Sequence, residues 1–329
     1  MPFMPTDPRE LVRWAALLDP RPTKAVQTPQ RPPGRLWQGQ AVTLDPLQSF
    51  AYVAGAGHRV PVGLAVTLMP LKHPFQAAME ARSLARITGH PVVYGLGPGP
   101  VVFQELLGTR PASQLGAVRE YVTAVRDLLA GQTSEPGDTI TSAMPLHRMD
   151  SPEVQIGLGV LRPAMARLAG GIADVAVTWL APAEYVGSVV EPALQEGAGA
   201  AGAARPWVSS VVPVALRRPG RNPYRTVLAS NYGHLQGPHY QDMLSRAGIQ
   251  FDIDRPGPAA KAVLDGGAFL HDDVEGLGQR LSAYTEAGVD EVVLNLSGVH
   301  ALEGPDAAYD EAAQLLEVLL PTAGATSVA

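Results

Sequence analysis

Residues 60–99, VPVGLAVTLMPLKHPFQAAMEARSLARITGHPVVYGLGPG, decide the fold of this chain. The segment begins with an apolar stretch, Val60–Leu68, which predicts a buried β-strand. A loop with a His73-Pro74 step and an Ala-rich helix follow, and a second apolar strand, Val92–Leu96, ends in a Gly-Pro-Gly loop. This pattern predicts one β-α-β unit, and α/β folds bind their ligands at the carboxyl ends of such strands.

Apolar runs of this kind alternate with amphipathic stretches along the chain, as expected for a parallel sheet covered by helices. Pro8–Leu18 and Leu115–Ala130 have apolar residues at helical spacing and predict two of these helices. We therefore predict an α/β fold, a (β/α)8 TIM barrel. Its first strand, within Met1–Pro5, is expected to be shortened or irregular because prolines disfavour a central strand. The other predicted strands are Leu36–Gln40, Val60–Leu68, Val92–Leu96, Val154–Leu158, Val175–Leu180, Trp207–Leu216 and Glu291–Leu296.

Length and composition limit the class of protein. A chain of 329 residues with 46% hydrophobic residues can form one barrel domain over residues 1–329. The net charge of −6 provides no basic field, so we expect no nucleic-acid partner. Neither a signal pattern nor a membrane-spanning apolar run is present in the sequence. The absence of cysteine excludes disulfides and thiol nucleophiles and fits a cytoplasmic protein.

Irregular segments between the periodic ones are where a substrate pocket would be shaped. We expect this role for residues 20–58, 99–114, 132–151 and 217–240. Residues 197–204, GAGAAGAA, predict a flexible connection.

Two glycine-rich strand ends are candidate cofactor sites. Gly95–Pro100 is not a dinucleotide fingerprint, because Pro100 replaces the last glycine of GxGxxG. It is either a tight turn or a backbone that approaches a planar ring. Gly157–Met165 contains Arg162-Pro163 at the expected start of a helix, which is either a phosphate cradle or an ordinary helix start. Thr178 and Trp179 end the next strand at the same rim, although core packing also explains Trp179.

Histidines offer weaker signals. His73 precedes a proline at a strand end, where a loop-fixing hydrogen bond and a catalytic role are both open. His234 and His239 are five residues apart, and a metal site would need a third ligand, so we expect no metal. The sequence has no GxSxG elbow of a serine hydrolase.

Five motifs, in order, resemble the luciferase-like family of flavin- and F420-dependent oxidoreductases. They cover most of the chain between Leu36 and Leu320. The matching pieces are GLAVTLMP followed by KHP (63–70 and 72–74), GLGPG (95–99), EY with LLAG (120–121 and 128–131), GVLRPAM through TWLAP (159–182) and AGVDEVVL (287–294).

The resemblance implies an enzyme with a (β/α)8 barrel, usually a homodimer, that binds FMN or coenzyme F420 at the carboxyl rim. It also implies a non-proline cis peptide at Val66-Thr67 or a neighbouring bond. The residues placed around the cofactor by this resemblance are Val66, Thr67, Gly97, Pro98, Gly99, Gly157, Leu158, Gly159, Arg162 and Thr178.

Departures from the family pattern bear on the reaction. F420-dependent dehydrogenases of the family tend to have a histidine and a glutamate where this chain has Gln38-Gly39-Gln40 and Gly99. Neither glutamine nor glycine can remove a hydroxyl proton, which favours an F420H2-dependent reductase of an activated C=C or C=N bond in a small molecule. The catalytic residues stay unassigned, with His73, Gln40 and Trp179 as candidates. The alternatives are an FMN-dependent monooxygenase supplied by a separate cofactor reductase, and a non-catalytic flavin-binding or partner barrel.

Overall fold

A computed structural model describes residues 5–18, 34–40, 43–133, 137, 140 and 144–319. All strand pairs within these residues are parallel. The sheet runs β1-β2-β4-β5-β6-β7-β8, with β3 beside β4 and β9 beside β7. The strands are β1 (Leu36–Gln38), β2 (Val62–Leu64), β3 (Thr67–Leu68), β4 (Val92–Gly97), β5 (Val154–Gly159), β6 (Val175–Trp179), β7 (Trp207–Leu216), β8 (Leu270–Asp272) and β9 (Glu291–Asn295).

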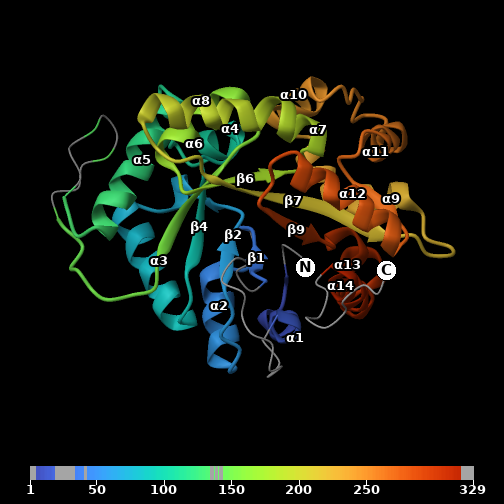
Figure 1. Cartoon of the computed structure of the whole chain (residues 1–329), viewed down its shortest axis with the longest axis horizontal. Helices are drawn as coiled ribbons and strands as arrows, with labels where there is room; N and C mark the ends of the chain where they lie inside the picture. The colour runs from blue at the N-terminus through green and yellow to red at the C-terminus, as the bar shows by residue number, and fades with distance from the viewer. Residues whose placement is uncertain are drawn as a thin grey trace, which may run out of the picture.

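Helices surround these strands as an outer layer (Figure 1). Several begin with proline in their first turn, where its missing N–H costs no hydrogen bond. The helices are α1 (Pro8–Leu18), α2 (Pro46–Gly55), η1 (Met69–Leu71), α3 (Pro74–Thr88), α4 (Val101–Leu106), α5 (Gln114–Leu129), α6 (Pro163–Ile172), α7 (Ala183–Tyr185), η2 (Val186–Val190), α8 (Glu191–Ala201), α9 (Pro223–Leu235), α10 (Pro238–Arg246), α11 (Pro256–Asp265), α12 (Val274–Glu286), α13 (Ser297–Glu303) and α14 (Pro305–Leu319).

The ring of strands is joined by side chains at one seam. Among the described residues no ladder pairs β1 with β9. There Arg35 Nη1 lies 2.7 Å from Glu291 Oε2, and Trp37 Nε1 donates to Glu291 Oε1 at 3.1 Å. A cavity of about 620 Å³ lies along the seam, with Trp14 and Leu281 among its lining residues. The arrangement is a (β/α)8 barrel in which the described strands form no backbone ladder at this seam. The expected first strand lies, apart from Pro5, outside the described residues.

The predicted strands are confirmed with small changes at their ends. Val60–Leu68 is divided into β2 and β3, and the division lies at a cis peptide bond between Ala65 and Val66. This bond neighbours Val66-Thr67, so the cis peptide implied by the family resemblance is present. The short strand β8 was not predicted, because three residues are too few to show a periodic pattern.

The prediction of a flexible connection at 197–204 is wrong. Helix α8 extends through this segment to Ala201, since alanine has the highest helix propensity. Its glycines bring α8 close to α6: a Cβ at Gly197 would overlap the carbonyl oxygen of Arg167. A Cβ at Gly170 of α6 would likewise overlap the carbonyl oxygen of Leu194. Small residues here allow the two helix backbones to touch.

The segment 217–240 is also more ordered than predicted. It contains α9 and the start of α10, and Asn222 caps α9 by accepting hydrogen bonds from the N–H groups of Tyr224 and Arg225. Helices α2 and α4 occupy parts of two other segments expected to be irregular, 20–58 and 99–114. Parts of the irregular segments 20–58 and 132–151 lie outside the described residues. These parts are residues 20–33, 41–42, 134–136, 138–139 and 141–143.

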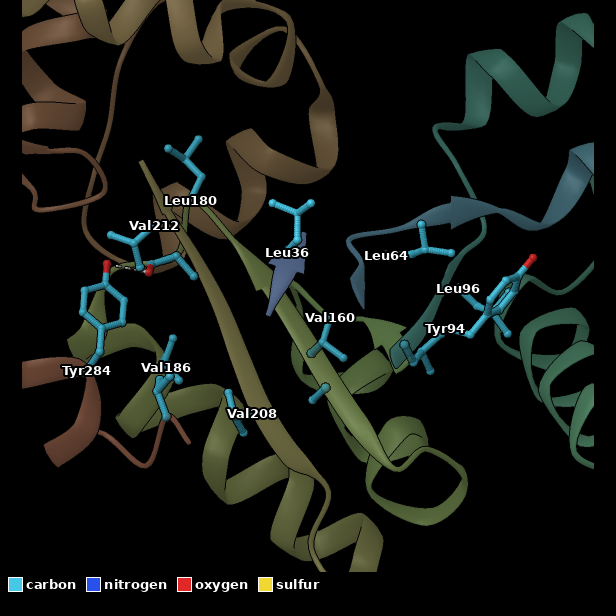
Figure 2. Close-up of a cluster of buried hydrophobic side chains, with 14 of the residues drawn as sticks. Leu36, Leu64, Tyr94, Leu96, Val160, Leu180, Val186, Val208, Val212 and Tyr284 are labelled. Carbon is cyan, nitrogen blue, oxygen red and sulfur yellow. Dashed lines mark hydrogen bonds between the residues drawn. The ribbon is translucent and has the colours of Figure 1, made fainter. Parts of the chain in front are cut away.

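The side chains of successive strand residues alternate between a shell core under the helices and the barrel interior. Figure 2 shows the shell core, with Leu64, Tyr94 and Leu96 grouped near one end and Val208 and Val212 toward the other. The interior cluster contains Trp37, Ala65, Val93, Val175, Val177, Val211 and Val293.

One side of the barrel interior carries glycine instead of valine. Gly95 and Gly157 are paired in register on β4 and β5, and a Cβ on Gly157 would lie 3.0 Å from Gly95 Cα. A Cβ on Gly95 itself would overlap the carbonyl oxygen of Leu64 on β2. The close approach of these three strands therefore requires glycine at position 95.

We expect Gly95→Ala to lower the free energy of unfolding by about 3 kcal/mol or more, because the backbone of β2 would have to move. Thermal or urea denaturation followed by circular dichroism measures this loss. The matched control is Gly199→Ala on the exposed face of α8, where nothing lies within 4 Å of the added methyl group. This control is expected to gain up to about 1 kcal/mol. Equal stability of the two variants would contradict the close approach of β2 and β4.

Candidate functional site at the barrel mouth

The mouth of the barrel is shaped around Val66. A Cβ on Gly97 would lie 2.5 Å from Val66 Cγ2, and a Cβ on Gly159 would lie 3.5 Å from Val66 Cγ1. Val66 packs against the interior cluster. The structure thus brings together three of the residues expected at the cofactor, one each from the ends of β4 and β5 and one between β2 and β3. The absence of side chains on the two glycines lets Val66 pack directly against the ends of β4 and β5.

Thr67 and Gln40 are tied to each other beside this position. Thr67 Oγ1 donates to Gln40 Oε1 at 2.9 Å, and the Gln40 N–H donates to the carbonyl oxygen of Val66 at 3.1 Å. The first of these bonds fixes the Gln40 side chain. Since an amide does not titrate in water, Gln40 can bind and orient a ligand but cannot act as a general acid or base.

The Pro98-Gly99 loop is held by a residue that the sequence did not single out. Gln104 of α4 is buried, and its Nε2 donates to the carbonyl oxygens of Pro98 at 2.8 Å and Gly99 at 3.1 Å. Gly99 has φ +74°, in the left-handed region that glycine adopts without strain. A glutamine within the apolar sequence VVFQEL is the signal that could have identified this clamp.

The Gly157–Arg162 segment leads from β5 into the amino end of α6. Tyr185 donates from its hydroxyl to the carbonyl oxygen of Leu161 at 2.9 Å and so fixes this loop. No side chain caps α6, so the N–H groups of its first turn face outward, the usual arrangement at an anion site. Arg162 Nη1 lies 3.7 Å from Asp242 Oδ2 of α10, and both side chains are partly exposed. The guanidinium of Arg162 therefore lies beside the uncapped amino end of α6.

Leu158 and Thr178 lie on the other face of the sheet. Both are buried and alternate with interior residues, so their side chains point toward the shell of helices. Thr178 Oγ1 donates to Ser210 Oγ at 2.8 Å, across the register pair of β6 and β7. Thr178 thus fastens two strands together below the mouth.

Trp179 connects the barrel interior to α9. Its ring packs against the interior cluster and stacks on His234, with ring centroids 5.0 Å apart at 22°. Tyr240 of α10 meets the edge of His234 and also contacts His239. Sequence reasoning missed this aromatic wall because its members are 55 to 61 residues from Trp179 along the chain.

Leu180 follows Trp179 with φ +58°, a left-handed conformation that is uncommon for leucine. Its side chain is buried at 1% exposure, and its N–H donates to the carbonyl oxygen of Val211 at 3.2 Å. Such strained backbones are held by their surroundings and cluster at functional sites. The conformation turns the chain sharply at the end of β6, directly beside the aromatic wall.

His73 lies at the surface, at the start of α3. Its Nδ1 accepts the N–H of Phe75 at 3.1 Å and so caps that helix. The preceding Lys72 contacts Glu80 at 2.6 Å and Asp45 at 3.7 Å, which ties the loop after β3 to α3 and α2. Both residues therefore hold the loop that follows Val66.

Burial sets the protonation of the aromatic wall. Burial lowers the pKa of the His234 imidazole to about 4, and the nearby His239 acts in the same direction. Burial also lowers the pKa of His239 and raises that of the Tyr240 phenol. At neutral pH all three groups are uncharged. Within the described ranges, no three His, Cys, Asp or Glu side chains are placed to hold a metal ion.

Two further polar groups face no partner near the mouth. The amide of Gln38, at the end of β1, is fully buried and has no hydrogen-bond partner among the described residues. The same is true of Nδ2 of Asn295, at the end of β9, while its Oδ1 accepts the Ser297 N–H. Buried amides are normally hydrogen-bonded. Asn295 lies on the interior side of the sheet with Val293 and suits a polar ligand or bound water, whereas Gln38 alternates with the interior Trp37 and lies on the side of the helices.

We expect stability to fall as the pH drops from 6.5 toward 4 because of His234. The unfolded chain binds a proton on this histidine below about 6.5, whereas the folded chain resists protonation down to about 4. Up to about 3 kcal/mol of stability would be lost across this window. Urea denaturation at several pH values should show a shallower acid slope for His234→Gln, and His147→Gln on an exposed loop should keep the native slope. An unchanged slope in the first variant would contradict a buried, neutral His234.

Comparisons with known proteins agree with this architecture. The chain is 27% identical over 131 residues to 5,10-methylenetetrahydromethanopterin reductase of Methanolobus tindarius, which covers 40% of each protein. The chain thus matches well under half the length of this relative. Its structure is similar to that of the coenzyme F420-dependent tetrahydromethanopterin reductase of Methanopyrus kandleri, with a TM-score of 0.65, 18% identity, and coverage of 86% of this chain and 88% of the other.

A second similar structure is the oxygenating constituent of 3,6-diketocamphane monooxygenase of Pseudomonas putida, solved with FMN. The TM-score is 0.66 at 16% identity, with 94% of this chain and 90% of the other covered. These two structures share the fold at low identity. The family model described as luciferase-like monooxygenase matches residues 4–291, nearly the whole chain. This chain therefore belongs to the luciferase-like monooxygenase family of oxidoreductases.

Proposed function

We propose that this protein is an F420H2-dependent reductase that transfers a hydride to an activated C=C or C=N bond of a small molecule or natural-product intermediate. The observation that carries the proposal is that neither Gln40 nor Gly99, at the ends of two neighbouring strands, can act as a base. Gln40 and Gly99 stand where the resemblance to F420-dependent dehydrogenases would place a histidine and a glutamate, and Gln40 is fixed by Thr67. Oxidation of an alcohol requires removal of the hydroxyl proton, whereas reduction of an unsaturated bond does not.

The residues of the mouth fit a deazaflavin or a flavin. A planar ring would lie over Val66 and the side-chain-free ends of β4 and β5 at Gly97 and Gly159. The unpartnered Nδ2 of Asn295, which lies on the interior side of β9 together with Val293, suits the polar edge of such a ring. These groups would bind and orient the cofactor by shape and by hydrogen bonds.

The phosphate would be held at the amino end of α6. Its free N–H groups favour an anion, and Arg162 adds a charge-assisted contact. When bound, the reduced deazaflavin supplies the hydride. The apolar interior below Val66 excludes water from that side of the ring.

The proton that completes the reduction has no carboxylic acid donor at the ends of β1, β4 and β5. Residues 38–43, 97–101 and 159–163 contain no Asp or Glu. Tyr240, whose pKa is raised by burial, retains its proton at neutral pH on the edge of the mouth. Solvent or this phenol would supply the proton to the acceptor.

The alternative is an FMN-dependent monooxygenase that uses O2 and a separate flavin reductase. It is favoured by the similar FMN-bound monooxygenase structure, since the same glycine-bordered space accepts either ring. The third possibility is a non-catalytic barrel that binds flavin or serves as a partner protein. In that case neither F420 nor FMN would support turnover.

Three expectations accompany the proposal. Residues 1–329 act as one barrel domain, the protein works in the cytoplasm, and it forms a homodimer. Exposed apolar side chains on α4, Val102 at 63% and Leu106 at 82% exposure, are available to such contacts. No helix of the described part of the chain is long and apolar enough to cross a membrane.

Fluorescence titration of the purified apo protein with oxidised F420 and with FMN tests the cofactor. We expect micromolar or tighter binding of F420 and clearly weaker binding of FMN. The reverse preference would overturn the proposal in favour of the monooxygenase, and binding of neither would favour a non-catalytic barrel. If F420 binds, single-turnover bleaching of F420H2 absorbance by α,β-unsaturated or imine acceptors identifies the substrate class.

Gly159→Leu is expected to weaken F420 binding at least about tenfold while leaving the fold intact. A Cβ at this position meets only ordinary contacts, so the larger side chain would extend into the proposed ring space. Gly199→Leu on the exposed face of α8 is the matched control and should bind as the native protein does. Native affinity in Gly159→Leu, with unchanged thermal stability, would place the ring elsewhere.

A further inference from the structure

A separate cavity of about 300 Å³ lies outside the barrel mouth, between α7, α10 and α12. Its volume is at the lower end of the range for small-molecule pockets. Tyr185 and Tyr284 are among its lining residues, and both are nearly fully buried. The Tyr284 hydroxyl donates to the carbonyl oxygen of Ala181 at 3.1 Å, and Figure 2 shows this ring near Val186. The two tyrosines thus give the cavity a rigid lining beside the end of β6.

The charged groups of this cavity favour an anion. It is lined by two arginines, Arg246 and Arg280, and one acidic residue, Glu184. Arg246 is held by Asp242 at 3.1 Å through Nε, which leaves its outer nitrogens available. Arg280 makes no hydrogen bond or ion pair with any described residue. Its Nη2 lies 3.8 Å from the position of a Cβ on Gly267, at the edge of the cavity.

The cavity continues the proposed phosphate site. Asp242 contacts both Arg162 at 3.7 Å and Arg246 at 3.1 Å, so the three charged groups form a row from α6 to the cavity. Tyr185 joins the two sites as well, because its hydroxyl binds the carbonyl oxygen of Leu161 while the residue lines the cavity. The three proposed sites therefore follow one another around the barrel. The ring position lies at β4 and β5, the start of α6 lies between β5 and β6, and the cavity lies beside β6 and β7.

We propose that this cavity binds the carboxylates that F420 carries beyond its phosphate. F420 extends from its phosphate through a lactyl group into a chain of glutamates, whereas FMN ends at the phosphate. A guanidinium pair beyond the phosphate site has a partner in the first cofactor and none in the second. The inference rests on the proposed function, and it assigns to Arg280 and Arg246 a part in the choice of cofactor.

The test compares F420 that carries glutamates with F420-0, which keeps the phosphate and lactyl group but has no glutamate. We expect the native protein to bind the glutamate-bearing form roughly fivefold more tightly, as expected for a partly exposed charge pair. Arg280→Gln should remove this difference without changing the affinity for F420-0. Arg119→Gln on the exposed face of α5 is the control and should keep the difference. Raising the salt concentration should reduce the difference in the native protein, since exposed charges are screened.

Equal affinity of the native protein for the two F420 forms would overturn this inference and leave the proposed reductase intact. An affinity difference that survives unchanged in Arg280→Gln would also overturn it. Failure of either F420 form to bind, with tight binding of FMN, would instead refute the proposed function. The experiment therefore distinguishes the failure of the subsite from the failure of the reductase.

Discussion

The ion pair between Arg35 and Glu291 joins the two ends of the described sheet. Glu291 begins β9 and accepts from three donors: Arg35 at 2.7 Å, Trp37 at 3.1 Å and Ser209 at 3.0 Å. The Arg35 and Glu291 side chains are only 7% and 20% exposed, so the pair gains from a low local dielectric and pays for desolvation. Removing one partner of such a buried pair typically costs about 3–5 kcal/mol. No backbone ladder joins β1 to β9 in the part of the chain that the structure describes, and this carboxylate connects the two strands at the amino end of the barrel.

The same constraint explains why a large ring fills one side of the interior and closely packed strand backbones form the other. Trp37, held by Glu291, lies in the barrel interior, where a Cβ on Gly63 would approach its ring to 2.6 Å. The large ring at the bottom therefore requires glycine beside it on β2. Higher up, Gly95 and Gly157 allow β2, β4 and β5 to approach closely. Val66 is the side chain left at the top, so the shape of the mouth follows from the packing below it.

The sequence predicted the strands well because apolar runs that are buried on both faces have no competing explanation. The break within Val60–Leu68 and the helix at 197–201 were harder, for opposite reasons. The strand Val60–Leu68 is broken in the structure although its sequence is apolar throughout. The helix at 197–201 is regular although its Gly- and Ala-rich composition is typical of linkers. In α8 the glycines serve contact with α6, a tertiary requirement that local propensity does not encode.

The candidate site could be predicted only in part. Gly97 and Gly159 were visible because glycine at a strand end has few explanations. The contacts of Trp179 with His234, and of Arg162 with Asp242, join residues that are 55 and 80 positions apart, and no local pattern announces them. Their elements, α9 and α10, follow β7 in a polar segment whose helical face was not recognised.

Local charge, rather than net charge, decides whether an acidic protein can hold an anionic cofactor. The chain has a net charge of −6, so its overall field opposes an anion at long range. Beyond about 8–10 Å that field is screened at physiological salt, whereas a helix end and a guanidinium act at contact distance. Arg162 at the start of α6 and Arg246 of α10 both contact Asp242, so two cations face this one carboxylate. In the proposed function, a phosphate at the start of α6 would supply a second anion beside these two guanidinium groups.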